Sequence, residues 1–140
     1  MIADPLKATT AIASAGLSAQ STRMRVVAEN LANAQSTGET PGADAFRRKL
    51  VTLRATAPDV DGFARVEIGD ITPDRGDFRI EHDPAHPAAD VHGDVKYPNV
   101  NPLIELADMR EATRAYEANL QVMKQARSLV TMTIDLLRER

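Results

Sequence analysis

Three histidines and two aspartates crowd one short stretch of the chain, and these are side chains that commonly bind transition metals. His82, His86 and His92 lie within eleven residues, beside Asp83 and Asp90. A zinc or iron site needs three or four such ligands converging at about 2.0–2.2 Å. Their spacing matches no established ligand motif, so we expect a solvated loop in which aspartates cap turns. A small metal-dependent enzyme stays open as an alternative, and metal content after purification would decide it.

No arrangement of nucleophiles predicts catalysis. The chain lacks cysteine, and it contains no G-x-S-x-G motif and no glycine-rich phosphate loop. Serine and histidine follow no catalytic-triad order, and acidic residues are frequent enough that chance carboxylate pairs carry no information. We therefore expect no enzyme activity, no cofactor and no small-molecule substrate.

Charge and composition exclude further classes of protein. The 140 residues carry 17 basic and 20 acidic side chains, a net charge of −3, which lacks the basic excess that nucleic-acid binding requires. No run of about 18 apolar residues predicts a membrane span, and "MIADPLKATT" lacks the features of a cleaved secretory signal. Aromatic residues make up only 4% of the chain, which predicts a thin core completed by a partner.

Arg47, Arg48 and Lys49 form a basic cluster with nearby Arg54. Two interpretations of this cluster remain open. The first is a solvated edge of a strand or loop. The second is a surface that forms salt bridges with an acidic neighbour.

Proline and glycine divide the chain into three segments. No proline lies between Leu6 and Thr40, none follows Pro102, and glycine is rare at both ends. Since proline breaks helix interiors and glycine weakens them, both ends are predicted to be helical. We expect a mainly α fold with an N-terminal helix (1–35), a middle segment of extended loops and short strands (36–102), and a C-terminal helix (103–140). The helices are expected to pack as a coiled-coil-like pair.

Residues in both terminal segments recur every seven positions, as on the contact face of a coiled coil. The N-terminal segment has one column at Thr10, Leu17, Met24 and Leu31, and a second at Leu6, Ala13, Gln20, Val27 and Ala34. The C-terminal segment has one column at Met109, Tyr116, Met123, Val130 and Leu137, and a second at Leu106, Thr113, Leu120 and Ile134, broken by Arg127. Asn101 followed by Pro102 is predicted to begin the C-terminal helix.

Short strands are predicted in the middle segment. The stretches "ARVEIGDI" and "DFRIE" each place alternate apolar residues on one face. Between them "TPDRGD" is a turn, since Pro73 fixes φ and Gly76 tolerates unusual backbone angles, so the two strands are predicted to form a hairpin. A further strand is predicted in "FRRKLVTLRA". Residues 81–102 are predicted to be a long extended loop, because proline, aspartate and histidine dominate them.

Three asparagines lie among small apolar residues of the predicted helices: Asn30 and Asn33 in "AENLANAQST", and Asn119 in "RAYEANL". Asparagine is unfavourable in a helix interior, because its amide competes for backbone hydrogen bonds. A role at the helix end suits Asn33 but not Asn119, which lies in mid-helix. Since a buried amide fixes register at a cost in stability, we interpret these residues as specificity devices at helix–helix contacts.

In order along the chain, "SAQSTRMRVVAENLANAQST", "FRRK", "DPAHPAAD", "GDVKYPNVN" and "EATRAYEANLQVM" resemble the rod and hook proteins of the bacterial flagellum. "NLANA" is shared widely in that family, whereas "HDPAHPAAD" with "YPNVN" is more specific to its proximal-rod members. The stretch "STGETPGADAFRRK" is longer than the Thr-Pro-Gly-aromatic sequence usual in the wider family, and it displaces Phe46. The resemblance covers nearly the whole chain.

This resemblance implies a structural subunit of the flagellar basal-body rod. Its terminal helices would pack with those of other rod subunits into a helical tube around the protein-export channel, transmitting torque, with the middle segment facing outward. The flagellar type III export apparatus would export it, without a cleaved signal peptide, into the rod that crosses the periplasm. The residues implied at the subunit interface are Leu17, Met24, Asn30, Leu31, Asn33, Met109, Tyr116, Asn119 and Met123. The alternative from another class is a coiled-coil adaptor protein that forms a discrete dimer. A solution mass that stays at one discrete value, without further polymerisation, would favour it.

Overall fold

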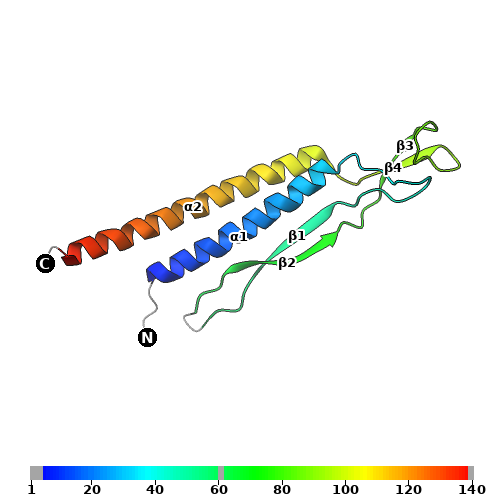
Figure 1. The fold of residues 1–140 in the computed structure, drawn as a ribbon. Coiled ribbons are helices and arrows are strands. Elements are labelled where there is room, and N and C mark those ends of the chain that lie inside the picture. The colour runs from blue at the N-terminus through cyan, green and yellow to red at the C-terminus, as the bar shows by residue number, and fades with distance from the viewer. Residues whose placement is uncertain (1–4, 60–61, 139–140) are drawn as a thin grey trace.

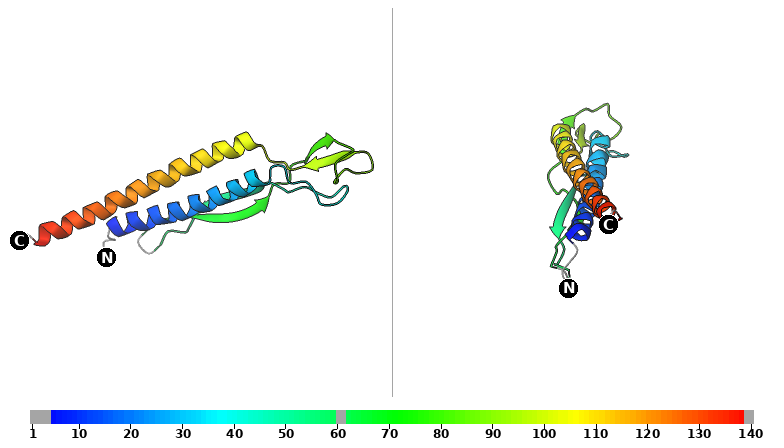
Figure 2. Two further views of the ribbon diagram at one scale, coloured as in Figure 1. Left: turned by 45° about the horizontal axis from the view of Figure 1, so that its top comes forward. Right: turned by 90° about the vertical axis from the view of Figure 1, so that its left-hand side faces the viewer.

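The computed structural model describes residues 5–59 and 62–138, and two long antiparallel helices dominate it (Figure 1). Helix α1 spans Pro5–Ala32 and helix α2 spans Pro102–Arg138, which confirms the two predicted terminal helices. At about 1.5 Å per residue, their 28 and 37 residues extend over about 42 and about 55 Å. Helix α2 therefore continues past the first turn of α1 (Figure 2).

The start of α2 follows from its sequence. Asn101 is the N-cap, because its Oδ1 accepts the backbone N–H of Leu103 at 3.0 Å. Pro102 occupies the first helical position, where its missing N–H costs no hydrogen bond. The predicted helix start is therefore confirmed.

Two antiparallel strand pairs lie between the helices in sequence. Strand β1 (Lys49–Ala55) pairs with β2 (Val66–Pro73), and β3 (Arg79–His82) pairs with β4 (Asp94–Tyr97). The strands predicted in "FRRKLVTLRA", "ARVEIGDI" and "DFRIE" are thus confirmed as β1, β2 and β3. Each pair forms its own two-stranded sheet.

The predicted hairpin between β2 and β3 is wrong. The "TPDRGD" turn does form, since Asp74 Oδ1 accepts the N–H of Gly76 at 2.8 Å, but it connects two sheets instead of two strands of one sheet. The partner of β3 is β4, which lies inside the stretch predicted to be an extended loop, so that prediction is wrong for β4. Strand β4 has only four residues and directly precedes Pro98, so its local sequence gives little strand signal.

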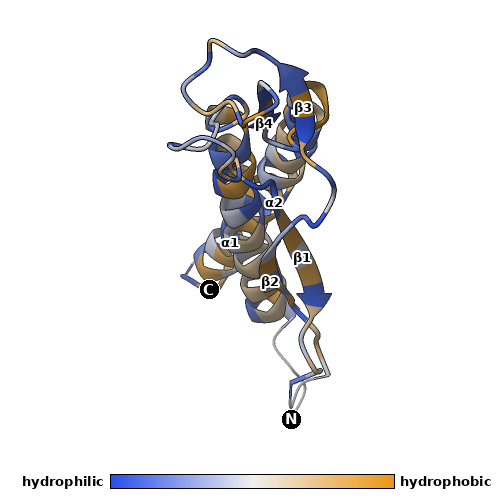
Figure 3. Ribbon diagram, turned by 90° about the vertical axis from the view of Figure 1, so that its right-hand side faces the viewer, coloured by the Kyte–Doolittle hydropathy of each residue, from blue (hydrophilic) through white to orange (hydrophobic). Residues whose placement is uncertain are grey.

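Helix α1 is the middle layer of the subunit. Helix α2 packs along one side of it and the β1–β2 ribbon along another, and within the described residues the ribbon makes no comparable contact with α2 (Figures 1 and 2). The β3–β4 pair lies beyond the end of the helix pair where α1 ends and α2 begins. Figure 3 looks along the helices and shows the ribbon lying to one side of them.

The core is thin, as the low aromatic content predicted. Between the helices and the ribbon it consists of small side chains, namely those of Ala13, Ala19, Val26, Val27, Ala112 and Ala126. A second small group lies near the β3–β4 pair and contains Ala45, Ala88, Val95 and Val100. No described helix has the length and apolar character needed to cross a membrane.

Two of the four predicted heptad columns are displaced by one residue. On α1, three residues of the column containing Val27 are buried as predicted, namely Ala13, Val27 and Ala34, and the other two are half-buried. Gly16 and Asn30 are buried where Leu17 and Leu31 were expected. Leu17 and Leu31 lie half-buried at the flank. The pairing of the terminal helices is confirmed, whereas coiled-coil packing stays a prediction.

Helix α2 shows the same displacement. Ala112 and Ala126 are buried, in place of Thr113 and Arg127, and Glu105 belongs to their seven-residue column. Small side chains allow two helix backbones to approach closely, so the pair turns its smallest residues inward and leaves larger ones at the edge. The predicted column through Met109, Tyr116 and Met123 lies half-buried beside them.

Candidate functional site

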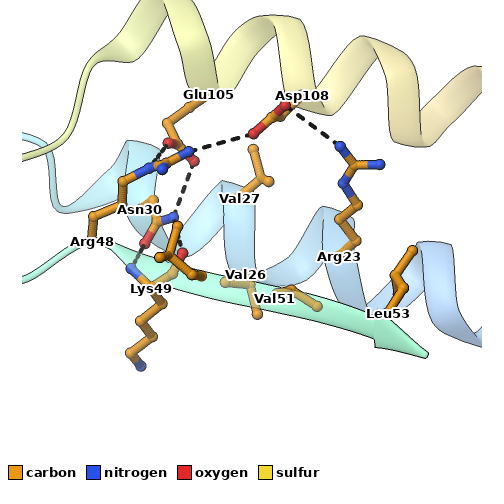
Figure 4. Close-up of a pocket in the computed structure, with 11 residues that line it drawn as sticks. Arg23, Val26, Val27, Asn30, Arg48, Lys49, Val51, Leu53, Glu105 and Asp108 are labelled. Carbon is orange, nitrogen blue, oxygen red and sulfur yellow. Dashed lines mark hydrogen bonds and ion pairs between the residues drawn. The ribbon is translucent and has the colours of Figure 1, made fainter. Parts of the chain in front are cut away.

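A buried polar cluster joins α1, β1 and α2 at the end of the helix pair nearer the middle segment (Figure 4). At its centre is Asn30, which is 1% exposed. Its Nδ2 donates to the backbone carbonyl of Lys49 at 2.9 Å and to Glu105 Oε2 at 3.0 Å, and its Oδ1 accepts the Lys49 N–H at 2.8 Å. The amide thus pairs with both backbone groups of Lys49, as a neighbouring strand would, where β1 begins.

Glu105 is fully buried, and Arg48 supplies its counter-charge. Arg48 Nε lies 2.5 Å from Glu105 Oε1, and its two other guanidinium nitrogens lie 3.5 Å from Asp108 and 3.8 Å from Asp74. Because both carboxylate oxygens of Glu105 have partners, the buried charge is compensated.

The backbone of Arg48 ties further segments to this point. Its N–H donates to Asn99 Oδ1 at 2.9 Å, and its carbonyl accepts the N–H of Asp74 at 2.7 Å. The start of β1, the end of β2 and the chain entering α2 therefore meet at one residue.

A cleft of about 300 Å³ opens beside the cluster. Its wall is part apolar and part charged, and it is formed by Arg23, Val26, Val27, Asn30, Arg48, Lys49, Leu50, Val51, Leu53, Glu105 and Asp108. Arg23 lies 3.5 Å from Asp108 and 3.4 Å from Glu111, and Lys49 pairs with Glu29, so the charged groups of the wall have partners within the chain. Positioning, and not acid–base or nucleophilic chemistry, is what this arrangement supports.

The three histidines do not converge on one point. His82 Nδ1 lies 2.9 Å from Asp94, whereas His86 Nδ1 accepts the N–H of Ala88 at 3.1 Å. Among the described residues, no group of three or more histidine, cysteine or acidic side chains is placed to hold a metal ion.

Asp90 caps the loop that contains these histidines. Its Oδ1 accepts the backbone N–H groups of His92 at 2.8 Å and Asp94 at 3.0 Å, as the turn-capping interpretation predicted. The bonds from Asp94 and His92 lower the pKa of Asp90 below its ordinary value of 3.8. Their contribution to loop stability is therefore present above that value and lost as the pH falls through the lowered pKa.

All four residues of the basic cluster have partners within the chain. Arg48 joins the buried polar cluster, Lys49 forms an ion pair with Glu29, and Arg54 Nε lies 2.8 Å from Glu67. The guanidinium of Arg47 lies 4.1 Å from the centre of the Phe78 ring. These side chains thus make salt bridges and a cation–π contact inside the subunit, which neither interpretation of the sequence anticipated.

The asparagines have different surroundings. The Asn30 amide makes its hydrogen bonds to Lys49 and Glu105 within one chain, and its place at a contact between subunits stays a prediction. Asn33 bonds locally at the helix end, where its Nδ2 donates to the Glu29 carbonyl at 2.9 Å and its Oδ1 accepts the Ser36 hydroxyl at 3.1 Å.

Asn119 lies at the contact between α1 and α2. A methyl group added to Gly16 would lie 2.7 Å from its amide atoms, so the Asn119 side chain packs directly over Gly16. The amide donates to the carbonyl of Ala115 at 2.9 Å.

The remaining residues expected at a subunit interface are Leu17, Met24, Leu31, Met109, Tyr116 and Met123. All six are half-buried along the helix pair. Their membership of an interface between subunits stays a prediction.

Sequence reasoning missed Glu105, the buried carboxylate of the cluster. The signal that points to it is its spacing, because Glu105 shares a seven-residue column with Ala112, Asn119 and Ala126. A charged residue on a column of small residues is expected to be buried and paired. Its partner Asn30 is 75 positions away, and although Asn30 itself stands out as an asparagine within a helix, nothing in the sequence links the two.

Within the part of the chain that the structure describes, the distal end of α2, residues 127–138, packs little against other elements. Every residue in it is exposed, and Val130 lies opposite Leu6 and Thr10 near the first turn of α1. The distal end of α2 carries large apolar side chains at exposures of 41–70%, namely those of Leu129, Val130, Met132, Ile134, Leu136 and Leu137. Apolar residues grouped in this way mark an interaction surface.

Comparison with known proteins gives consistent matches. Residues 92–136 match the family described as "Flagellar basal body rod FlgEFG protein C-terminal". The chain is 59% identical over 135 residues to the flagellar basal-body rod protein FlgC of Agrobacterium fabrum, covering 96% of this chain and 97% of that one.

More distant relatives carry the same name. FlgC of Escherichia coli O6:H1 is 35% identical over 126 residues, covering 89% of this chain and 92% of the relative. FlgC of Bacillus subtilis is 32% identical over 143 residues, covering 89% and 93%. These relatives are named as rod proteins and not as enzymes, in agreement with the expectation for this chain. By this similarity over nearly its full length, the chain belongs to the FlgC family of flagellar basal-body rod proteins.

Proposed function

We propose that this chain is a structural subunit of the proximal rod that assembles into a helical tube around the protein-export channel. The terminal helical segments, 1–35 and 103–140, form the tube, and the middle segment, 36–102, faces outward and contacts neighbours. The subunit transmits torque in the rod that crosses the periplasm. It is exported by the flagellar type III apparatus without a cleaved signal peptide.

The observation that carries this proposal is the unpartnered apolar surface at the distal end of α2. Leaving side chains such as Leu136 and Leu137 in water is unfavourable by about 25 cal/mol for each Å² of apolar area. A helical array of subunits covers such a surface with the helices of neighbours, because its contacts are heterologous and repeat along the assembly.

The total surface of the subunit supports the same conclusion. Its accessible area is 9,565 Å². A compact monomer of 15.2 kDa is expected to expose about 7,100 Å². The excess of about 2,500 Å² is comparable with the area that obligate interfaces bury.

Torque transmission requires a subunit whose helices and strands do not shift relative to one another. The close contact of Asn119 over Gly16 holds the helices together in their middle, and the buried polar cluster holds β1 against both helices. Directional hydrogen bonds and close packing both resist sliding of one element past another.

The test places charge on the distal end of α2. Met132→Glu with Leu136→Glu changes two exposed residues one turn apart, so the free subunit should keep its stability within about 0.5 kcal/mol. Export of the variant should continue, whereas its incorporation into basal bodies and swimming should be lost. Secretion assays, basal-body purification and motility plates measure the three outcomes.

The matched control exchanges the same two side chains, as Met132→Leu with Leu136→Met. It keeps the surface apolar and of similar volume, so rods and swimming should be normal. Normal rods built by the Met132→Glu, Leu136→Glu variant would show that the distal end of α2 is no interface.

A further inference from the structure

The pairing of Arg48 with Glu105 is not explained by stability alone. Burying a carboxylate against a guanidinium has a large desolvation cost, and apolar residues of similar volume at such sites are often equally stable or more stable. Glu105 is nevertheless fully buried, at the point where α1, α2, β1 and the end of β2 meet.

The other contacts that hold the β1–β2 ribbon are weakly directional. The ribbon packs on α1 alone among the helices, through half-buried apolar residues such as Val51, Val66 and Ile68. A two-stranded ribbon is marginal by itself, and apolar packing tolerates several arrangements at similar energy. Nothing in those contacts selects one angle between the ribbon and the helix pair.

The polar cluster does select one arrangement. Asn30 pairs with both backbone groups of Lys49, which places β1 along α1 at a single residue. Arg48 reaches Glu105 and Asp108 on α2 and Asp74 after β2. Each of these bonds is lost if sliding or rotation of the ribbon moves its donor and acceptor atoms apart by a few ångströms.

We propose that Arg48, Glu105 and Asn30 are positioning residues for rod assembly, which hold the β1–β2 ribbon at one orientation to the helix pair. This inference rests on the proposed function, because identical subunits must present the same outward and tube-forming surfaces to fit a helical array. The cluster gives every subunit that same geometry, and the contribution of the buried Arg48–Glu105 pair is to conformational specificity more than to stability.

The test replaces the buried ion pair by apolar residues, in the full-length chain with Glu105→Leu and Arg48→Met. The variant should unfold at a denaturant midpoint equal to or above that of the original chain. Its swimming should fall at least tenfold, while its export continues. The matched control is Arg54→Met with Glu67→Leu, which removes an exposed Arg–Glu pair of the same ribbon and should change neither swimming nor export.

Distances between spin labels report the orientation directly. The chain has no cysteine, so Ala55→Cys with Ala118→Cys labels the ribbon and α2, and Ser21→Cys with Ala118→Cys labels α1 and α2; all three positions are exposed. In the apolar variant the ribbon–α2 distribution should broaden at least twofold, whereas the α1–α2 distribution should keep its width. The Arg54, Glu67 control should leave both distributions unchanged.

Arg48→Lys provides a second variant if the chain with Glu105→Leu and Arg48→Met does not fold. A lysine keeps the charge but cannot span three carboxylates, so the ribbon–α2 distribution should still broaden and swimming should still decline. A narrow ribbon–α2 distribution with normal swimming, in either folded variant, would overturn the proposal. Broadening with normal swimming would also overturn it, since orientation would then not matter for assembly.

The two proposals fail separately. The label distances are measured on the free subunit and do not depend on the rod. Failure of the rod function would appear in the Met132, Leu136 variant, whose polar cluster is intact.

Discussion

At the scale of single residues, Asn30 shows how a side chain that disfavours helix can still stabilise a helical protein. An asparagine in place of alanine costs a helix roughly 0.6 kcal/mol. Its three hydrogen bonds to Lys49 and Glu105 contribute about 1 kcal/mol each, and the bond to Glu105 satisfies one oxygen of a fully buried carboxylate. The amide is thus retained for its contacts with β1 and α2 and not for its helix propensity.

Asn30→Ala is predicted to destabilise the free subunit by about 3–5 kcal/mol, because it leaves the Lys49 backbone groups and one oxygen of Glu105 unpaired. Urea unfolding followed by circular dichroism measures this loss. The control is Asn33→Ala, whose bonds are local and half-exposed and whose cost should stay within about 1 kcal/mol. Equal stability of the two variants would contradict the role assigned to Asn30.

At the scale of elements, the contact between α1 and α2 is made by the smallest residues of each helix. Gly16 accommodates Asn119, and the buried residues of α2 other than Glu105 are alanines, Ala112 and Ala126. Each pair contributes little, so the length of the contact and the closeness of the backbones supply the stability.

Gly16→Ala is predicted to destabilise the helix pair in spite of alanine's better helix propensity. The added methyl group must displace the Asn119 amide at a cost of about 1–3 kcal/mol, against a gain of about 1 kcal/mol in the helix. In a background of Asn119→Ala the same substitution should become stabilising. A double-mutant cycle measures the coupling, and additive effects would show that Gly16 and Asn119 do not pack together.

At the scale of the whole molecule, one end of the subunit is ordered by many contacts and the other by few. The buried polar cluster and both strand pairs lie toward the first half of α2, whereas residues 127–138 are exposed on every side. Long helices draw most of their stability from packing, so the distal end of α2 is expected to depend on neighbours.

Amide hydrogen exchange should therefore distinguish the two halves of α2. In the free subunit the amides of residues 130–138 should exchange at least tenfold faster than those of residues 105–123, and in the assembled rod the difference should vanish. Protease should likewise cut the distal end of the free subunit and spare it in the rod. Equal protection of residues 130–138 in both states would contradict this dependence.

The sequence by itself determined the elements whose signals are local. The scarcity of proline and glycine predicted both helices, Asn101 with Pro102 predicted the start of α2, and the β propensity of three stretches predicted β1, β2 and β3. The aspartate caps of the histidine loop also followed from local turn chemistry. These features depend on residues a few positions apart, so the chain encodes them wherever it lies in space.

Only the tertiary structure decided which elements pair and which faces meet. Strand β2 pairs with β1 and not with β3, since strand pairing depends on partners and on the helix beneath them as well as on the nearest turn. One predicted column on each helix is displaced by one residue, because close approach of the backbones favours small side chains over large ones. Asn30 meets Glu105 across 75 positions of sequence. A contact of that separation is fixed by tertiary packing, and local propensity carries no information about it.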